Sequence, residues 1–137
     1  MTTGERIKTY LRGWETGDPS LLLSQTVEGF FFDDPNRGII ARADYEAYVA
    51  EIWEEAREYR GDHQLDYLED LSEILHKEEN DGTVSVWFWW EIAGTPIEGS
   101  SLVKMNSEGV VSETICYYGQ TAYANRLKLF ADRPAPR

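Results

Sequence analysis

Apolar residues near the N-terminus recur with the period of an α-helix. Four of them occupy positions i, i+3, i+4 and i+7: Ile7, Tyr10, Leu11 and Trp14. Thr2 and Glu5 have the spacing of a capping box, and Gly17 can end the helix in a left-handed conformation. The pattern therefore predicts a helix over residues 3–16 with one buried face.

A second short helix and a strand are expected next. Asp18 followed by Pro19 is typical of an N-cap and a first helical position, so the chain turns sharply there. The aromatic run Phe30-Phe31-Phe32 favours a short strand. It should stop at Asp33-Asp34-Pro35, because proline lacks the amide donor that a sheet requires. The strand would deliver Asp34 to the rim of an apolar region.

The longest helical pattern begins at Asp44, a good N-cap, and ends at Gly61. Apolar side chains keep the helical spacing for more than three turns between these residues: Tyr45, Tyr48, Val49, Ile52, Trp53, Ala56 and Tyr59. The acidic residues lie on the opposite face: Glu51, Glu54, Glu55 and Glu58. We assign them to solubility, since charges on one face of an amphipathic helix are usually solvated.

After residue 64 the helical spacing gives way to alternation. Candidate strands cover about residues 66–79, 83–92, 97–106 and 110–118, with turn residues between them. Three consecutive hairpins predict an antiparallel sheet. Residues 120–130 can form a closing helix or an ordered arm, and residues 133–137 a frayed tail.

The strand expected over residues 83–92 is apolar on both faces. Trp87 and Trp89 point away from the other apolar residues of this strand: Val84, Val86, Phe88, Trp90 and Ile92. A sheet with one solvated face would alternate apolar and polar residues. The helices of one small domain can cover only one face. We therefore infer a homodimer that packs through the outer sheet face.

Composition narrows the class of protein. Residues 1–137 suit one domain, and 42% hydrophobic content is typical of a globular chain. A net charge of -12 disfavours nucleic acid and membrane surfaces as partners. No apolar run is long enough for a membrane span and the N-terminus lacks a signal-peptide core, so a cytoplasmic location is expected. One cysteine, Cys116, and two histidines leave little room for a metal site.

The order of these elements resembles a known superfamily. A helix, a short helix, a strand ending in Asp-Pro, a long helix and four antiparallel strands are similar to the SnoaL-like polyketide cyclases and ketosteroid isomerases, within the nuclear transport factor two-like superfamily. The resemblance covers about residues 5–120 and leaves a C-terminal arm, 120–137. It implies an α+β, cystatin-like roll, in which a cone-shaped, curved antiparallel sheet wraps around the long helix with the N-terminal helices and encloses an apolar pocket.

The resemblance extends to two functional residues. In the ketosteroid isomerases a helical tyrosine lies seven residues before a Gly-Asp turn, and the general-base aspartate follows that glycine by seventeen and precedes a proline. Tyr10, Gly17 and Asp34-Pro35 match this spacing. The resemblance implies that Asp34 removes a proton beside a carbonyl while Tyr10 donates to the oxyanion. At the family's second donor, an aspartate, this chain has Ser101, and the cyclases' strand carboxylate has no clear match.

Elementary chemistry allows the same roles and also simpler ones. Desolvation in an aromatic pocket raises the proton affinity of a carboxylate, which suits a general base. The developing oxyanion then needs a donor, for which Tyr10 is the best candidate and Ser101 a weaker one. Alternatively, Asp33 and Asp34 form a turn that caps its own backbone, and Tyr10 is a core residue.

Further ligand contacts are expected from the aromatic residues and from the last strand. The tryptophans either line the pocket or belong to the core or an interface. Alternation places Thr114, Cys116 and Tyr118 on one face of the last strand, which the resemblance makes the pocket face. The full expected set of ligand-binding residues is Trp14, Phe30, Phe32, Tyr48, Trp53, Ser101, Thr114, Cys116 and Tyr118.

Three functions fit this sequence. The first is a cofactor-independent and metal-independent enzyme, of isomerase or polyketide-cyclase type, that transfers protons on a small hydrophobic carbonyl compound. The second is a non-catalytic module that holds a hydrophobic ligand or a partner in the same pocket. The third is a dehydratase or epoxide hydrolase in which Asp34 and either Glu98 or Glu113 surround an ordered water. The fold alone does not choose between them.

Overall fold

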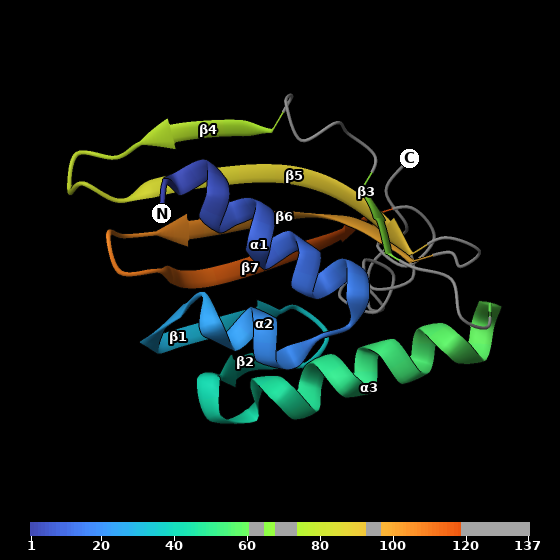
Figure 1. Cartoon of the computed structure of the whole chain (residues 1–137). Coiled ribbons are helices and arrows are strands. Elements are labelled where there is room, and N and C mark those ends of the chain that lie inside the picture. The colour runs from blue at the N-terminus through green and yellow to red at the C-terminus, as the bar shows by residue number, and fades with distance from the viewer. Residues whose placement is uncertain (61–64, 68–73, 93–96, 119–137) are drawn as a thin grey trace, which may run out of the picture.

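The structure is a computed structural model that describes residues 1–60, 65–67, 74–92 and 97–118 (Figure 1). The helices are α1 (Thr3–Thr16), α2 (Pro19–Ser24) and α3 (Arg42–Arg60). The strands are β1 (Thr26–Asp34), β2 (Gly38–Ala41), β3 (Leu65–Tyr67), β4 (Leu75–Glu78), β5 (Val84–Ile92), β6 (Glu98–Met105) and β7 (Val110–Tyr118). The arm expected after residue 120 lies outside the described residues.

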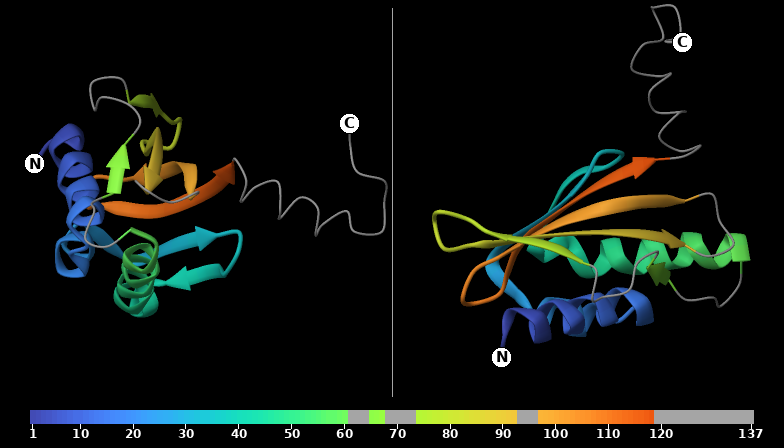
Figure 2. Two further views of the ribbon diagram at one scale, coloured as in Figure 1. Left: turned by 90° about the vertical axis from the view of Figure 1, so that its right-hand side faces the viewer. Right: turned by 90° about the horizontal axis from the view of Figure 1, so that it is seen from above.

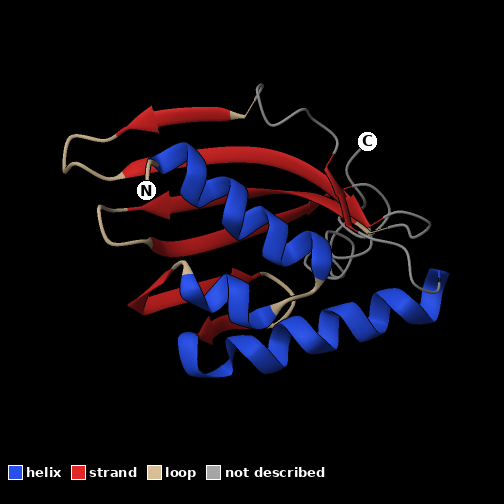
Figure 3. Cartoon of the chain, viewed as in Figure 1, coloured by secondary structure: helices blue, strands red, loops and turns tan. Residues whose placement is uncertain are grey.

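The strands form one seven-stranded sheet in the order β2-β1-β7-β6-β5-β3, and β4 pairs with the same edge of β5 as β3 does. The sheet is curved, and all three helices lie on one of its faces (Figures 1 and 2). Helices and strands thus form two layers, with the long α3 along the β1–β2 side of the sheet (Figure 3). This arrangement confirms the predicted α+β fold.

The N-terminal helices form as their capping residues predict. The Thr2 side chain accepts from the Glu5 amide at 3.1 Å, the Thr2 amide donates to the Glu5 carboxylate at 2.8 Å, and Gly17 ends α1 at φ 64°. Asp18 caps α2 by accepting from the Leu21 amide at 3.1 Å. These local bonds orient α1 so that its apolar face, which includes Tyr10, packs onto the sheet.

Several boundaries differ from the sequence prediction. The strand β2 was not expected; it returns beside β1 after a turn in which Gly38 has φ 84°. The predicted strand over 66–79 is two short strands, β3 and β4, in the described part of the chain. The helix α3 begins at Arg42, two residues before the predicted cap. The pairing of β1 with β7 is parallel, so the predicted antiparallel hairpins belong to a mixed sheet.

The two faces of β5 divide as predicted. Val86, Phe88, Trp90 and Ile92 are buried toward the helices, whereas Trp87 and Trp89 are only half-buried on the outer face. Among the helices of the described residues, none is long and apolar enough to cross a membrane.

We predict that Gly99 on β6 cannot accept a side chain. A Cβ atom there would lie 2.5 Å from the Cys116 carbonyl oxygen and 2.8 Å from Cζ2 of Trp90. Gly99→Ala should therefore lower the free energy of unfolding by about 1–3 kcal/mol, since a packed backbone must shift. Urea unfolding followed by tryptophan fluorescence measures this.

The matched control is Gly29→Ala on β1, where an added Cβ would meet nothing within 4 Å. This variant should change the free energy of unfolding by no more than about 0.5 kcal/mol. Equal effects of the two substitutions would contradict the close approach of β6, β7 and Trp90.

Candidate functional site

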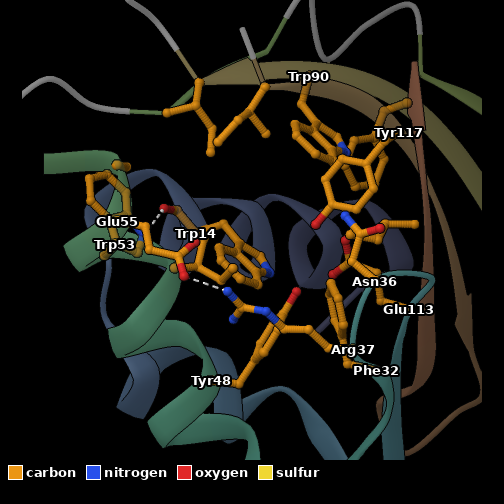
Figure 4. Close-up of a pocket in the computed structure, with 16 residues that line it drawn as sticks. Trp14, Phe32, Asn36, Arg37, Tyr48, Trp53, Glu55, Trp90, Glu113 and Tyr117 are labelled. Atoms are coloured by element: carbon orange, nitrogen blue, oxygen red, sulfur yellow. Dashed lines mark hydrogen bonds and ion pairs between the residues drawn. The ribbon is translucent and has the colours of Figure 1, made fainter. Parts of the chain in front are cut away.

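A cavity of about 230 Å³ lies between the inner face of the sheet and helices α1 and α3 (Figure 4). Its wall is mainly aromatic and aliphatic, with few polar groups. The lining residues are Trp14, Phe32, Asn36, Arg37, Tyr48, Ile52, Trp53, Glu55, Ala56, Phe88, Trp90, Ile92, Ile97, Glu113, Ile115 and Tyr117. Arg37 and Glu55 form an ion pair at 2.6 Å in this wall, and both side chains are partly exposed.

The most enclosed polar group of the wall is the carboxyl group of Glu113. This residue lies on β7, opposite Phe32 of β1 and Val103 of β6, and is 3% exposed. Its Oε1 accepts from the Tyr10 hydroxyl at 2.6 Å, and its Oε2 accepts from the Ser101 hydroxyl at 2.7 Å. Each oxygen of a carboxylate has two lone-pair positions, so both retain the capacity to interact with a ligand.

A chain of hydrogen bonds leads from α1 to Oε1 of Glu113. The Trp14 indole donates to the Tyr45 hydroxyl at 3.0 Å, and the hydroxyl oxygens of Tyr45 and Tyr10 are 2.6 Å apart. Because Tyr10 donates its single proton to Glu113, Tyr45 must donate to Tyr10. An indole N–H can only donate. Every donor of this chain therefore points toward Glu113.

A second chain reaches Oε2 of Glu113 from the sheet. The Trp90 indole donates to the Ser101 hydroxyl at 2.9 Å, and Ser101 donates to Glu113. Like the first chain, it begins at an indole N–H and has a fixed direction.

Burial raises the pKa of Glu113 above its usual value, although the hydrogen bonds from Tyr10 and Ser101 act in the opposite direction. The pKa values of the Tyr10 and Tyr45 hydroxyls are raised well above the usual range, first by burial and then by the nearby Glu113 charge. A carboxyl group with a raised pKa, at the wall of an apolar cavity, has the properties of a general acid or base.

Asp34 lies at a second polar cluster, behind the wall. It is fully buried, with 0% exposure, and is not a lining residue. Its Oδ2 accepts from the hydroxyls of Tyr48 at 2.7 Å and Tyr117 at 3.0 Å, and its Oδ1 accepts from the Asn36 amide at 2.8 Å. Burial and the Asp34 charge raise the pKa of Tyr48 and of Tyr117. Asp34 is connected to the cavity wall through Tyr48, Tyr117 and Asn36, which all line the cavity.

Several expected ligand-binding residues meet at the cavity. Trp14, Phe32, Tyr48 and Trp53 line it. Ser101 does not line the cavity itself, but it donates a hydrogen bond to Glu113, which does. Neither Phe30 nor Tyr10 lines the cavity. Phe30 packs on Tyr45 with ring centroids 4.7 Å apart, and the Tyr10 hydroxyl donates to Glu113.

The prediction of which face of β7 lines the pocket is wrong. Thr114 and Cys116 are exposed, and the opposite set of residues, Glu113, Ile115 and Tyr117, lines the cavity. The side chain of Tyr118 is outside the described part. The register causes this outcome, because Ile115 pairs with Ser101 and Ser101 pairs with the inward Phe88. Ser101 was expected in the pocket, and its partner on β7 is Ile115, so the correct register would have placed Ile115 and Glu113 on the pocket face.

Of the acids considered for a water-dependent reaction, Glu113 faces the cavity and Glu98 does not line it. Within the described residues, no three His, Cys, Asp or Glu side chains gather as a metal-binding group.

The raised pKa of Glu113 predicts a specific pH dependence of stability. The folded state binds the proton more tightly than the unfolded chain does, so Glu113 favours folding at low pH, and this contribution is lost as the pH rises. The difference in unfolding free energy between wild type and Glu113→Gln should fall from about pH 4.5 upward, by at most about 1.4 kcal/mol per pH unit, and level off above the native pKa.

Urea unfolding of both proteins between about pH 4 and about pH 8 measures this difference. Glu108→Gln, on the exposed β6–β7 turn, controls for the loss of one negative charge. A difference that instead rises with pH would show that the two hydrogen bonds outweigh burial and would contradict the raised pKa.

The comparisons with known proteins concern the fold of this chain. No family model and no curated protein matches it. Its fold is similar to that of an NTF2-like protein of unknown function from Cytophaga hutchinsonii, with a TM-score of 0.58, 15% identity and coverage of 90% of this chain and 96% of that one. A proposed polyketide cyclase from Pseudomonas putida matches with a TM-score of 0.57, 16% identity and coverage of 91% and 97%.

A third similar structure is a ketosteroid isomerase-like protein from Catenulispora acidiphila in complex with trimethylamine. The TM-score is 0.54, the identity is 16%, and 98% of this chain and 100% of that one are covered. At these identities the comparisons establish the fold and leave the activity open. The chain therefore has the nuclear transport factor two-like fold that its sequence resembles.

Proposed function

We propose that this protein is a cofactor-independent enzyme that transfers a proton on a small hydrophobic carbonyl compound, as an isomerase or a polyketide cyclase would. The observation that carries the proposal is Glu113, a carboxyl group with a raised pKa in the wall of an aromatic cavity. General acid–base catalysis needs such a group within reach of the ligand and outside bulk water.

The proposed step begins with ionised Glu113. Its carboxylate takes a proton from the carbon beside the carbonyl, and the C–H electron pair forms an enolate. An isomerase returns the proton to another carbon. In a cyclase, the enolate carbon forms a bond to a second carbonyl carbon, and the resulting alkoxide takes the proton from Glu113. Both routes end with Glu113 ionised, and neither needs a further reactant.

The roles proposed from the sequence for Asp34 and Tyr10 are modified by these contacts. As the base, Asp34 would have to act through Tyr48 or Tyr117, which separate it from the cavity. The Tyr10 hydroxyl donates to Glu113, so we propose that Tyr10 orients this carboxyl group. Glu113 and Asp34 are thus the two candidates for the base, and Glu113 is the one in direct reach.

A non-catalytic binding module is the second candidate function. Its support is that the oxygens of both buried carboxylates already have hydrogen-bond partners within the protein. The trimethylamine complex of the Catenulispora protein is an example of a small ligand held by this fold. A dehydratase or epoxide hydrolase has less support, because Glu113 lines the cavity without Asp34 or Glu98.

Deuterium exchange into a panel of hydrophobic ketones and β-keto esters tests the enzymatic function. We expect wild type to accelerate exchange beside the carbonyl. Glu113→Gln should reduce this acceleration about 100-fold or more, as expected for loss of a general base. Asp34→Asn should have a smaller effect, since Asp34 acts on the tyrosines of the wall. Mass spectrometry or proton NMR of the ketone measures the rate.

Glu98→Gln, a charge-matched substitution away from the cavity, serves as the control. A full loss in Asp34→Asn with activity retained in Glu113→Gln would assign the base to Asp34. Exchange no faster than in buffer, across the whole panel, would favour the binding module.

We also propose that the protein is a homodimer through the outer sheet face. One row of cross-strand neighbours on this face runs through Leu75, Trp87, Leu102, Thr114, Asp33 and Ile39. Leu75 and Ile39 are 55% and 62% exposed, and all three helices lie on the other side of the sheet (Figure 2). Four of these six residues are apolar, and exposed apolar side chains on one face favour burial against a partner.

The charges of the outer face are self-complementary. Lys77 and Lys104 flank Ser85 at one end of β5, and Glu91 pairs with Glu98 at the other end. A two-fold axis that sets the strands of two copies antiparallel would bring the lysines of one copy near the glutamates of the other, as an isologous interface requires.

Light scattering at micromolar concentration tests the dimer. Wild type should have twice the mass of one chain, and Leu102→Glu should reduce it to one chain by placing a charge between Trp87 and Thr114. Ala47→Glu, on the exposed side of α3, is the matched control and should remain dimeric. A wild-type mass of one chain would contradict the proposal.

A further inference from the structure

Two tyrosine hydroxyls in the cavity wall share one acceptor. Tyr48 and Tyr117 both donate to Oδ2 of Asp34, at 2.7 and 3.0 Å. Their hydroxyl groups point toward one another in the cavity (Figure 4). A phenolic hydroxyl has a single proton, and here each proton is engaged by a buried carboxylate. Toward a ligand, these two oxygens can therefore only accept hydrogen bonds.

The indole donors of the wall are engaged as well. Trp14 donates to Tyr45 and Trp90 donates to Ser101. The Trp53 indole donates to the Trp14 carbonyl oxygen at 3.1 Å. These aromatic side chains therefore offer a ligand their apolar surfaces, and the tyrosine pair adds two acceptors on one side of the cavity.

The orientation of the Asp34 carboxyl group is fixed from the backbone. The Asn36 amide donates to Oδ1 at 2.8 Å, in the turn that follows β1. This bond directs Oδ2 toward the tyrosines. Because Asp34 is fully buried, it acts on a ligand only by holding the two hydroxyl protons away from the cavity.

We propose that Tyr48 and Tyr117, positioned by Asp34, bind a hydroxyl group of the ligand as hydrogen-bond acceptors. The preferred ligand is then a compact hydrophobic alcohol or hydroxy-carbonyl compound. This inference deepens the proposed function, since it rests on the same cavity, but it concerns recognition and not proton transfer. An ammonium group is the alternative donor, and the Arg37 guanidinium, 5.5 Å from the centre of the Tyr48 ring, already takes the cation position over that ring.

Asp34→Asn should reverse this preference. The Asn36 amide needs an acceptor at the Oδ1 position, so the new side-chain oxygen should remain there and its NH₂ group should occupy the position of Oδ2. The NH₂ group would donate to the tyrosine oxygens, and the hydroxyl protons would turn toward the cavity. The pair would then donate, and a ketone would replace an alcohol as the better ligand.

The experiment compares the binding of 2-adamantanol, 2-adamantanone and 2-aminoadamantane by calorimetry. These compounds share one compact apolar cage and differ only in the polar group. Wild type should prefer the alcohol over the ketone about tenfold, because the ketone leaves buried acceptors without a donor. Tyr117→Phe and Tyr48→Phe should reduce the ratio toward one, and Asp34→Asn should bring it below one.

Glu98→Gln, which removes a charge away from the cavity, is the matched control and should keep the preference for the alcohol. Calorimetry measures affinity without a proton-transfer step, whereas deuterium exchange measures that step. The two proposals therefore fail separately. Circular dichroism verifies that each variant is folded. If a phenylalanine variant does not fold, Asp34→Asn still tests the inference. Equal affinities for the alcohol and the ketone in wild type, or a preference for the ketone or the amine, would overturn the inference. So would a preference for the alcohol that survives in both phenylalanine variants and in Asp34→Asn, or no binding of any compound.

Discussion

The site depends on a carboxyl group that is buried in the middle of a sheet. Removing Glu113 from water is costly, and the cost is offset only where donors meet both of its oxygens. Tyr10 and Ser101 supply these donors from two different elements, α1 and β6. The position of α1 on the sheet is therefore tied to Glu113 on β7. The packing of α1 on the sheet thereby also places one of the donors that the site needs.

Two buried carboxylates have different parts in this arrangement. Glu113 lies in the wall, where burial outweighs its hydrogen bonds and keeps its proton affinity high. Asp34 lies behind the wall and has three donors within hydrogen-bond distance: two tyrosine hydroxyls and a backbone amide. The same chemical group is suited to exchange a proton in one place and to orient its neighbours in the other. Local contacts decide between these roles.

The sequence predicted the parts of the fold that are set by local interactions. The caps of α1 and α2 and the two faces of β5 follow from neighbouring residues and appear as expected. Non-local pairing was not predictable in the same way. The face of β7 depends on its register with β6, and a shift by one residue exchanges all of its side chains between the two faces. For this reason Thr114 and Cys116 were expected in the pocket, whereas Glu113 and Tyr117 lie there.

The two indole groups at the start of the hydrogen-bond chains have a consequence for the electrostatics of the cavity. An indole cannot accept, and ionised Glu113 can only accept, so the N–H and O–H dipoles of both chains point from the indoles toward the carboxylate before a ligand arrives. While Glu113 is ionised, the donors of both chains stabilise its negative charge. Water would have to reorient around a new charge, whereas these dipoles need not move. The protein thus has a preorganised environment for an anion that forms at this position.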